Sequence, residues 1–263
     1  EPEDEFGDYS IKIRLNDKIA NESKEFQSII KLVPFEYKNY FDDDESFAEW
    51  MNFYYKSPSP EKAIDAYLYY AQSKLNESKS SFLPVFSFFI EIFKNNTYLY
   101  PYLIDLYESQ SNKTKIYILY LLRHGNYDLG DFANQLSKEE KALYQKLLSE
   151  QLPDPYGKIN NPSQLDMLWG EFMANGSYKP IKKVVETLEL AKYKGYLEKY
   201  KNSDKTEDDH QKAYYDAIYQ AAKWSLNSNC SQHMLVKDYC NYIYKNETLS
   251  ETMRLELKEI LGQ

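Results

Sequence analysis

Apolar side chains recur at helical spacing along most of this chain, and this periodicity is the feature that most constrains its fold. The clearest stretch is "PSQLDMLWGEFMANGSYKPIKKVVETLE", residues 162–189. In its first half, apolar residues recur every three or four positions, which is typical of one buried helix face: Leu165, Leu168, Trp169 and Phe172. Ser163, followed three residues later by Asp166, has the spacing of a capping box. We therefore predict a helix over 163–175.

A turn and a second helix follow at once. Asn175-Gly176 can adopt the left-handed conformation that ends a helix, and Pro180 suits a first helical turn, where no backbone donor is needed. A second apolar stripe then runs to about residue 200 and predicts a helix over 179–201: Ile181, Val184, Val185, Leu188, Ala191 and Leu197. Two such helices form an antiparallel hairpin that still needs a neighbour for its outer apolar face.

The same rhythm extends over most of the chain. A helix with Phe47, Trp50, Met51 and Tyr54 comes first, and further helices are predicted at about 60–74, 80–94, 98–109, 113–124, 137–150, 207–228, 231–245 and 249–261. With only 8 glycines and few alternating runs, a β-rich or glycine-loop α/β architecture is disfavoured. We expect an all-α fold of stacked antiparallel helical hairpins, solenoid-like in the manner of tetratricopeptide or HEAT repeats, although no repeat matches the full tetratricopeptide consensus.

The amino-terminal segment differs from the rest. "YSIKIRL", residues 9–15, alternates and predicts a short strand or an arm, and a short helix is expected to end before Pro34. We assign residues 1–20 to an N-terminal arm and residues 21–263 to a single helical domain. The aperiodic stretch 152–162, rich in proline, is the place where that domain would divide.

Charge argues against nucleic acid as a partner, and hydropathy argues against a membrane-spanning helix. The net charge of −9 and the scattered lysines disfavour nucleic acid. A membrane-spanning helix needs about 18 uninterrupted apolar residues. The richest window, residues 82–93, is shorter and carries Glu91, so it predicts a buried helix.

Three segments resemble those of a poorly characterised family of predicted exported or lipid-anchored bacterial proteins. They are "PSQLDMLWGEFMANGSYKPIKKVV" (162–185), "AAKWSLNSNCSQHMLV" (221–236) and "FLPVFSFFIEIFKNN" (82–96), and the likeness covers about two thirds of the chain. The resemblance implies a helical fold in a bacterium and carries no catalytic residues with it. Because the chain starts at Glu1 instead of Met, we expect a segment upstream to have been removed, either a leader or lipid anchor or merely a tag. The first of these predicts a periplasmic or secreted location, with the cytoplasm as the alternative.

Thiols and imidazoles offer the main candidates for chemistry. Cys230-x-x-His233, with Cys240 and His210, contains the ligand types of zinc, and a Cys230–His233 pair could supply a thiol nucleophile. A polar turn that caps the next helix explains the same residues. If both cysteines lie on one helix, they are about 15 Å apart, too far for a disulfide.

The acidic runs at 42–45 and 207–209 lack the spacing of a calcium loop, so we interpret both as first turns of helices, where acids are favoured. Trp169 and Trp224 fit core positions better than ligand platforms. The 27 tyrosines are typical of AT-rich coding, and tyrosine is also common at interfaces.

We expect a non-enzymatic module that presents a concave, tyrosine-rich surface to a protein or peptide. The residues named as candidate contacts are Trp169, Tyr178, Trp224 and His233. No catalytic residue, cofactor or metal is assigned, and the oligomeric state is left open. The two alternatives are a thiol- or metal-dependent enzyme around Cys230 and His233, and a small-molecule or lipid carrier with an aromatic-lined pocket between Phe82 and Leu122.

Overall fold

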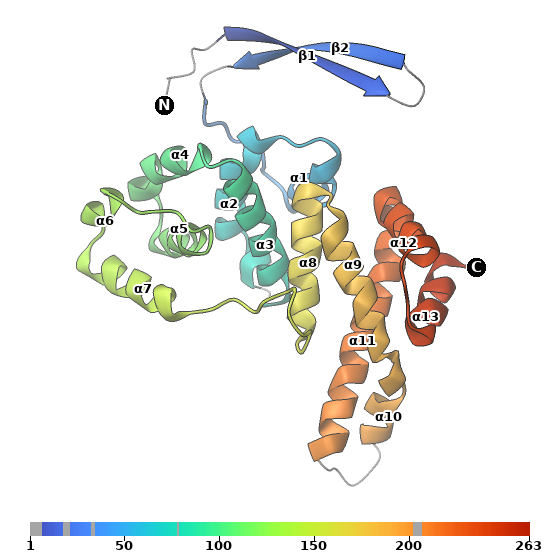
Figure 1. The fold of residues 1–263 in the computed structure, drawn as a ribbon. Coiled ribbons are helices and arrows are strands. Elements are labelled where there is room, and N and C mark those ends of the chain that lie inside the picture. Colours follow the sequence, from blue (N-terminus) through green and yellow to red (C-terminus); the bar gives the residue numbers. More distant parts are fainter. Residues whose placement is uncertain (1–6, 18–21, 33–34, 78, 202–206) are drawn as a thin grey trace. The chain divides into compact units, whose positions relative to one another are not determined.

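The chain forms two compact units, Glu1–Lys38 and Asn39–Gln263, in a computed structural model (Figure 1). The structure describes residues 7–17, 22–32, 35–77, 79–201 and 207–263. In these residues the fold is all-α apart from one two-stranded sheet near the N-terminus, as the sequence predicts. No helix of the described residues has the length and apolar character needed to cross a membrane.

The first unit is a β-hairpin of two antiparallel strands, β1 (Gly7–Asp17) and β2 (Glu22–Leu32). The strand predicted over 9–15 is confirmed, whereas the short helix expected before Pro34 is wrong, because most of that segment is β2. The spacing of Phe26, Ile29 and Ile30 fits a helix face, but Phe26 and Ile30 also fit the two-residue period of a strand. Pairing with β1 favours the strand, because it places Ile13 directly opposite Phe26. The first compact unit extends to Lys38 and includes the arm predicted over residues 1–20.

The second unit begins with seven helices, six of which the sequence predicts. They are α1 (Asp44–Phe53), α2 (Ala63–Gln72), α3 (Lys79–Asn95), α4 (Leu99–Asp105), α5 (Asn112–His124), α6 (Phe132–Gln135) and α7 (Lys138–Ser149). The largest difference in bounds is at α4, which ends four residues before the end of the predicted helix over 98–109 and is followed by a 3₁₀ turn. Short 3₁₀ turns lie between some of them: η1 (Tyr54–Lys56), η2 (Pro60–Lys62), η3 (Lys74–Glu77) and η4 (Tyr107–Ser109). The four-residue α6 is absent from the sequence prediction because it is too short to show a period.

The remaining elements follow the stretch 152–162, which lies inside the second unit. They are α8 (Pro162–Asn175), α9 (Tyr178–Glu186), η5 (Thr187–Tyr193), α10 (Tyr196–Lys201), α11 (Glu207–Gln232), α12 (Met234–Asn246) and α13 (Glu251–Leu261). The single helix predicted over 179–201 is therefore wrong. The chain tightens into η5 and then turns at Gly195, whose φ of 88° is a left-handed conformation.

The α8–α9 hairpin forms as the sequence predicts, with a different N-cap. Asn161 caps α8 in a capping box with Gln164, and Pro162 occupies the first turn, so the box lies two residues before the predicted one. Gly176 ends α8 in the left-handed conformation, with φ 64°. The predicted stripe of α8 faces the interior, and so does the second stripe as far as Leu188, since Leu168, Val184 and Leu188 have no exposed surface. Ala191 and Leu197, at the end of the second stripe, are only half-buried.

Aromatic rings fill the interior between α2, α3, α4 and α5. Ring centroids are 4.9 Å apart for Tyr67 and Phe89, 4.5 Å apart for Phe86 and Tyr120, and 5.3 Å apart for Phe93 and Tyr100. The predicted burial of the helix around residues 82–93 is confirmed.

Helices α3 and α8 lie side by side near the centre of the second unit (Figure 1). They approach closely at Gly170, where an added Cβ would lie 2.2 Å from the carbonyl oxygen of Pro84 and 3.1 Å from the amide nitrogen of Phe88. Both contacts are with backbone atoms. Glycine at this position therefore lets the two helix backbones touch.

Candidate binding site

A surface hollow lined by three tyrosines and two carboxylates lies between α9 and α12. Its volume is about 550 Å³, and we call it the tyrosine hollow; its lining residues are Tyr178, Asp238, Tyr239, Tyr242 and Glu247. Tyr178 is the first residue of α9, directly after the turn at Gly176 and Ser177. On α12, Tyr242 follows Asp238 by four positions and Tyr239 by three, so helical geometry brings the three side chains to neighbouring parts of one face.

The rings of the tyrosine hollow stand edge to face. The Tyr178 ring centroid is 5.4 Å from that of Tyr239 at 80°, and 5.9 Å from that of Tyr242 at 89°. The Tyr178 hydroxyl donates to Glu247 Oε1 at 2.9 Å, and the Tyr239 hydroxyl donates to the Gly176 carbonyl oxygen at 2.9 Å. Two of the three rings are therefore held by hydrogen bonds before any ligand binds.

The charge of the hollow is set mainly by Glu247 and Asp238. Lys182 Nζ donates to Glu247 Oε2 at 2.9 Å, and this hydrogen bond, together with that from Tyr178, lowers the pKa of Glu247. Burial, and then the hydrogen bond to Glu247, raise the pKa of Tyr178, so its hydroxyl stays protonated at neutral pH. Asp238 and Tyr242 are exposed, and Tyr242 keeps 54% of its surface. The hollow thus combines neutral ring surface with carboxylates.

The four candidate contact residues lie in different surroundings. Tyr178 lines the tyrosine hollow. Trp169 is a core residue, as expected, with 8% exposure and its ring against Phe172. The core position expected for Trp224 is wrong, because its side chain is 74% exposed. The buried face of α11 includes Ala222 and Ser225, and a residue two positions after Ala222 points about 200° around the helix.

His233, the fourth candidate, is 2% exposed and separates α11 from α12 as the N-cap residue of α12. Its Nδ1 lies 3.2 Å from the Tyr55 hydroxyl, and its ring packs 5.2 Å from Phe53 and 6.2 Å from Phe172. Burial, and then the charge of Lys56, lower the pKa of His233, so the imidazole is neutral at physiological pH. These contacts tie the ring to the α8 and α1–η1 side of the protein.

The two cysteines lie much closer together than the sequence suggests. The estimate of about 15 Å assumes one helix, but the chain breaks at His233 and places Cys230 on α11 and Cys240 on α12, with their sulfurs 3.7 Å apart. Within the described residues, no group of three or more histidine, cysteine, aspartate or glutamate side chains could hold a metal ion.

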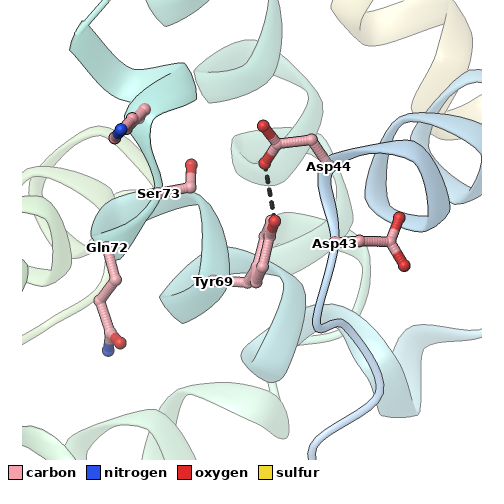
Figure 2. A pocket seen from close by; sticks show the side chains of 6 residues that line it. Asp43, Asp44, Tyr69, Gln72 and Ser73 are labelled. Carbon is pink, nitrogen blue, oxygen red and sulfur yellow. Dashed lines mark hydrogen bonds between the residues drawn. The ribbon is translucent and has the colours of Figure 1, made fainter.

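A second hollow, of about 470 Å³, lies beside the start of α1 (Figure 2). Asp43 caps α1 by accepting from the Ser46 amide at 2.7 Å, and Asp44 Oδ1 accepts from the Tyr69 hydroxyl at 2.6 Å, the dashed contact in Figure 2. The interpretation of the 42–45 run as a helix start is confirmed, and so is that of 207–209, where α11 begins. Both carboxylates at this hollow already serve the fold.

A third cleft, of about 260 Å³, lies between α3, α8 and the loop around Pro155. Burial raises the pKa of Glu171, which accepts from the Tyr156 hydroxyl at 2.6 Å, and burial lowers the pKa of His124. Ser87 Oγ and His124 Nε2 are buried atoms without a hydrogen-bond partner, but they have almost no accessible surface for a ligand to reach. This cleft is therefore a weaker binding candidate than the tyrosine hollow.

The sequence prediction includes Tyr178 but not the α12 side of the tyrosine hollow. The signal is present in "VKDYCNYIYKNE", because Tyr239 and Tyr242 are three residues apart on the helix predicted over 231–245. Their meeting with Tyr178 depends on the packing of α9 against α12, which local periodicity does not report.

The resemblance to a family of exported bacterial proteins stays a prediction. Comparison of this chain with family models, with curated proteins and with solved structures found no match.

Proposed function

We propose that this protein is a non-enzymatic binding module that takes up a lysine or arginine side chain of a partner protein or peptide in the tyrosine hollow. The observation that carries the proposal is the convergence of three tyrosine rings and two carboxylates on one hollow of about 550 Å³. Electron-rich ring faces attract cations, and carboxylates beside them supply opposite charge.

The chain uses the same chemistry internally. Lys179 Nζ lies 3.8 Å from the centroid of the Tyr156 ring, and Lys182 Nζ binds Glu247 at the edge of the hollow. A partner's ammonium or guanidinium group could occupy the open side, next to Asp238 and Tyr242. The net charge of −9 also favours approach of a basic partner over an acidic one.

The expected strength of one such contact is modest. A cation over exposed rings contributes about 0.5–1 kcal/mol, and an exposed ion pair contributes about 0–1 kcal/mol. Together they change affinity by about 2- to 30-fold, since 1.4 kcal/mol corresponds to a factor of ten. The backbone and neighbouring side chains of a bound segment must supply the rest, which favours a peptide over a free amino acid.

Two further parts of the proposal rest on the sequence. We propose a repeat-like stacking of helical hairpins, for which the α8–α9 pair is the best-defined unit. We also propose a periplasmic or secreted location, supported by the family resemblance. The enzyme alternative gains no support from His233, because its described contacts are with Tyr55 and Phe53 and not with Cys230. The carrier alternative gains no support from the helices between Phe82 and Leu122, because aromatic rings fill the space between them.

The test uses a peptide array in which each lysine- or arginine-centred peptide has an acetyl-lysine and a glutamate counterpart. Basic peptides that bind are then measured by isothermal titration calorimetry. We expect Tyr242→Ala and Asp238→Lys to weaken their binding, because both residues are exposed and line the hollow. Acetylation, which removes the charge, should have a similar effect.

Matched controls replace the same residue types elsewhere. Tyr214→Ala on α11 and Asp105→Lys on α4 change an exposed tyrosine and an exposed aspartate that do not line the hollow. Equal losses in the controls, or equal binding of acetylated and unmodified peptides, would overturn the proposal.

A further inference from the structure

Cys230 and Cys240 are the only two cysteines of the chain, and their sulfurs are in contact at 3.7 Å. They stand ten residues apart in sequence, on either side of the junction at His233. A disulfide has an S–S length of about 2.05 Å, so the sulfurs must approach by roughly 1.7 Å. Small side-chain rotations can supply a movement of this size, because the two sulfurs already face each other.

The two thiols differ in their access to solvent. Cys240 is fully buried, whereas Cys230 is partly exposed near the end of α11. A small molecule arriving from solvent therefore meets Cys230 first. Because of this difference in exposure, Cys230 is placed to attack an oxidant and Cys240 is placed to resolve the mixed disulfide that results.

The same contact makes Cys230 the more acidic thiol. The hydrogen bond between the two thiols lowers the pKa of Cys230, partial burial opposes this, and the charge of Lys237 adds to the lowering. The pKa of Cys240 is raised far above its usual range by the interaction with Cys230 and by burial. Because the thiolate is the reactive form, Cys230 is the thiol that starts an exchange reaction.

We propose that Cys230 and Cys240 are a site of intramolecular disulfide formation, oxidised by low-molecular-weight disulfides such as oxidised glutathione. The Cys230 thiolate attacks one sulfur of the oxidant, which forms a mixed disulfide and releases one thiolate. Cys240 then attacks the Cys230 sulfur, and the second sulfur of the oxidant leaves and takes up the Cys240 proton, so that it departs as a thiol. Two protein thiols are oxidised to one disulfide while one oxidant disulfide is reduced to two thiols.

A metal does not explain the pair equally well. Structural zinc needs four ligands, and within the described residues no third histidine, cysteine or carboxylate completes a group around these thiols. The bond would instead tie the last turn of α11 to α12, the helix that carries Asp238, Tyr239 and Tyr242.

The experiment follows the thiols of the full-length, folded protein. The reduced protein is incubated with oxidised glutathione, quenched with acid, unfolded and alkylated, and its intact mass is measured. We expect titratable thiols to fall from two per chain to none, with a mass lower by two hydrogens and no glutathione adduct. Peptide mapping should recover the Cys230 and Cys240 peptides linked to each other.

Variants separate the two roles. Cys240→Ala should stop at a stable glutathione adduct on Cys230, and Cys230→Ser should react much more slowly, with circular dichroism confirming that each variant is folded. Thiols that stay free in the wild-type protein, a lasting glutathione adduct, or a disulfide-linked dimer would each overturn the proposal. The wild-type result is decisive even if Cys240→Ala fails to fold.

Discussion

Replacing Gly170 with alanine sets two physical effects against each other. Alanine is favoured over glycine inside a helix by about 1 kcal/mol, so propensity alone predicts a more stable protein. The new Cβ, however, would lie 2.2 Å from the Pro84 carbonyl oxygen, where an ordinary C···O contact is about 3.3 Å. The α3 and α8 backbones would therefore have to separate by roughly 1 Å near Gly170.

The steric effect should be the larger one. Overpacking a core costs about 1–3 kcal/mol, and here neither partner is a side chain that can rotate away, so we take about 3 kcal/mol. After the gain in propensity, Gly170→Ala should lower the free energy of unfolding by about 2 kcal/mol. For a protein of this size that corresponds to a fall in Tm of about 4–8 °C.

Urea denaturation followed by circular dichroism measures this difference. With a slope of about 2 kcal/mol per molar urea, the midpoint should fall by about 1 M. The control is a pair of variants at Asn227, an exposed residue inside α11, where Asn227→Ala should be more stable than Asn227→Gly by about 1 kcal/mol. If Gly170→Ala were as stable as the wild type, or more stable by the difference between Asn227→Ala and Asn227→Gly, the steric argument at Gly170 would be wrong.

Three further outcomes are expected. Partial burial raises the pKa of Glu140, but hydrogen bonds at its capping box outweigh this and lower the pKa to about 2. The stability that the Glu140 charge adds is therefore complete above about pH 4.5 and is lost as the pH falls towards 2. In thermal melts, Glu140→Gln should have a lower Tm than the wild type at pH 7 and the same Tm near pH 2. Asp216 is fully buried and accepts from the Leu197 amide at 2.9 Å; Asp216→Ala should cost about 2–3 kcal/mol in urea denaturation, and Asp216→Asn less. Oxidation of Cys230 and Cys240 should raise the free energy of unfolding by at most about 3 kcal/mol, and a Tm unchanged or lowered on oxidation would indicate a strained bridge.

Helices in the second unit were predictable wherever an apolar stripe and a capping residue indicated the same helix boundary. Ser137 illustrates this, because it caps α7 in a capping box with Glu140, and the predicted range 137–150 differs from Lys138–Ser149 by one residue at each end. Gly176 likewise ends α8 where the Asn-Gly pair indicates. Such signals are local, so the sequence alone reports them.

Errors arose where tertiary partners decide the outcome. Residues 22–32 carry an apolar spacing compatible with a helix, and pairing with β1 makes them a strand. Trp224 was expected at a core position, yet the side of α11 that faces its neighbours is determined by packing. The cysteine pair was missed for the same reason, since the break at His233 decides whether ten residues span a helix or fold back.

The candidate site was only partly predictable. Tyr178 could be named because it lies in the well-marked turn between the two helices of the α8–α9 hairpin, and Tyr239 and Tyr242 share one helix face. The two sides meet because α9 packs against α12, which are far apart in sequence. Contacts between distant helices depend on which apolar faces pair, and a single sequence does not specify that choice.

The exposure of Trp224 also separates the protein's intrinsic fluorescence into two sources. Trp169 is buried and Trp50 is partly buried, with its Nε1 donating to Ser59 Oγ at 2.8 Å, whereas Trp224 is 74% exposed. An aqueous quencher such as iodide therefore reaches Trp224 preferentially. In a chain without Trp224 the tryptophan emission comes from Trp50 and Trp169 alone, so that emission reports on the packing of α1 and α8.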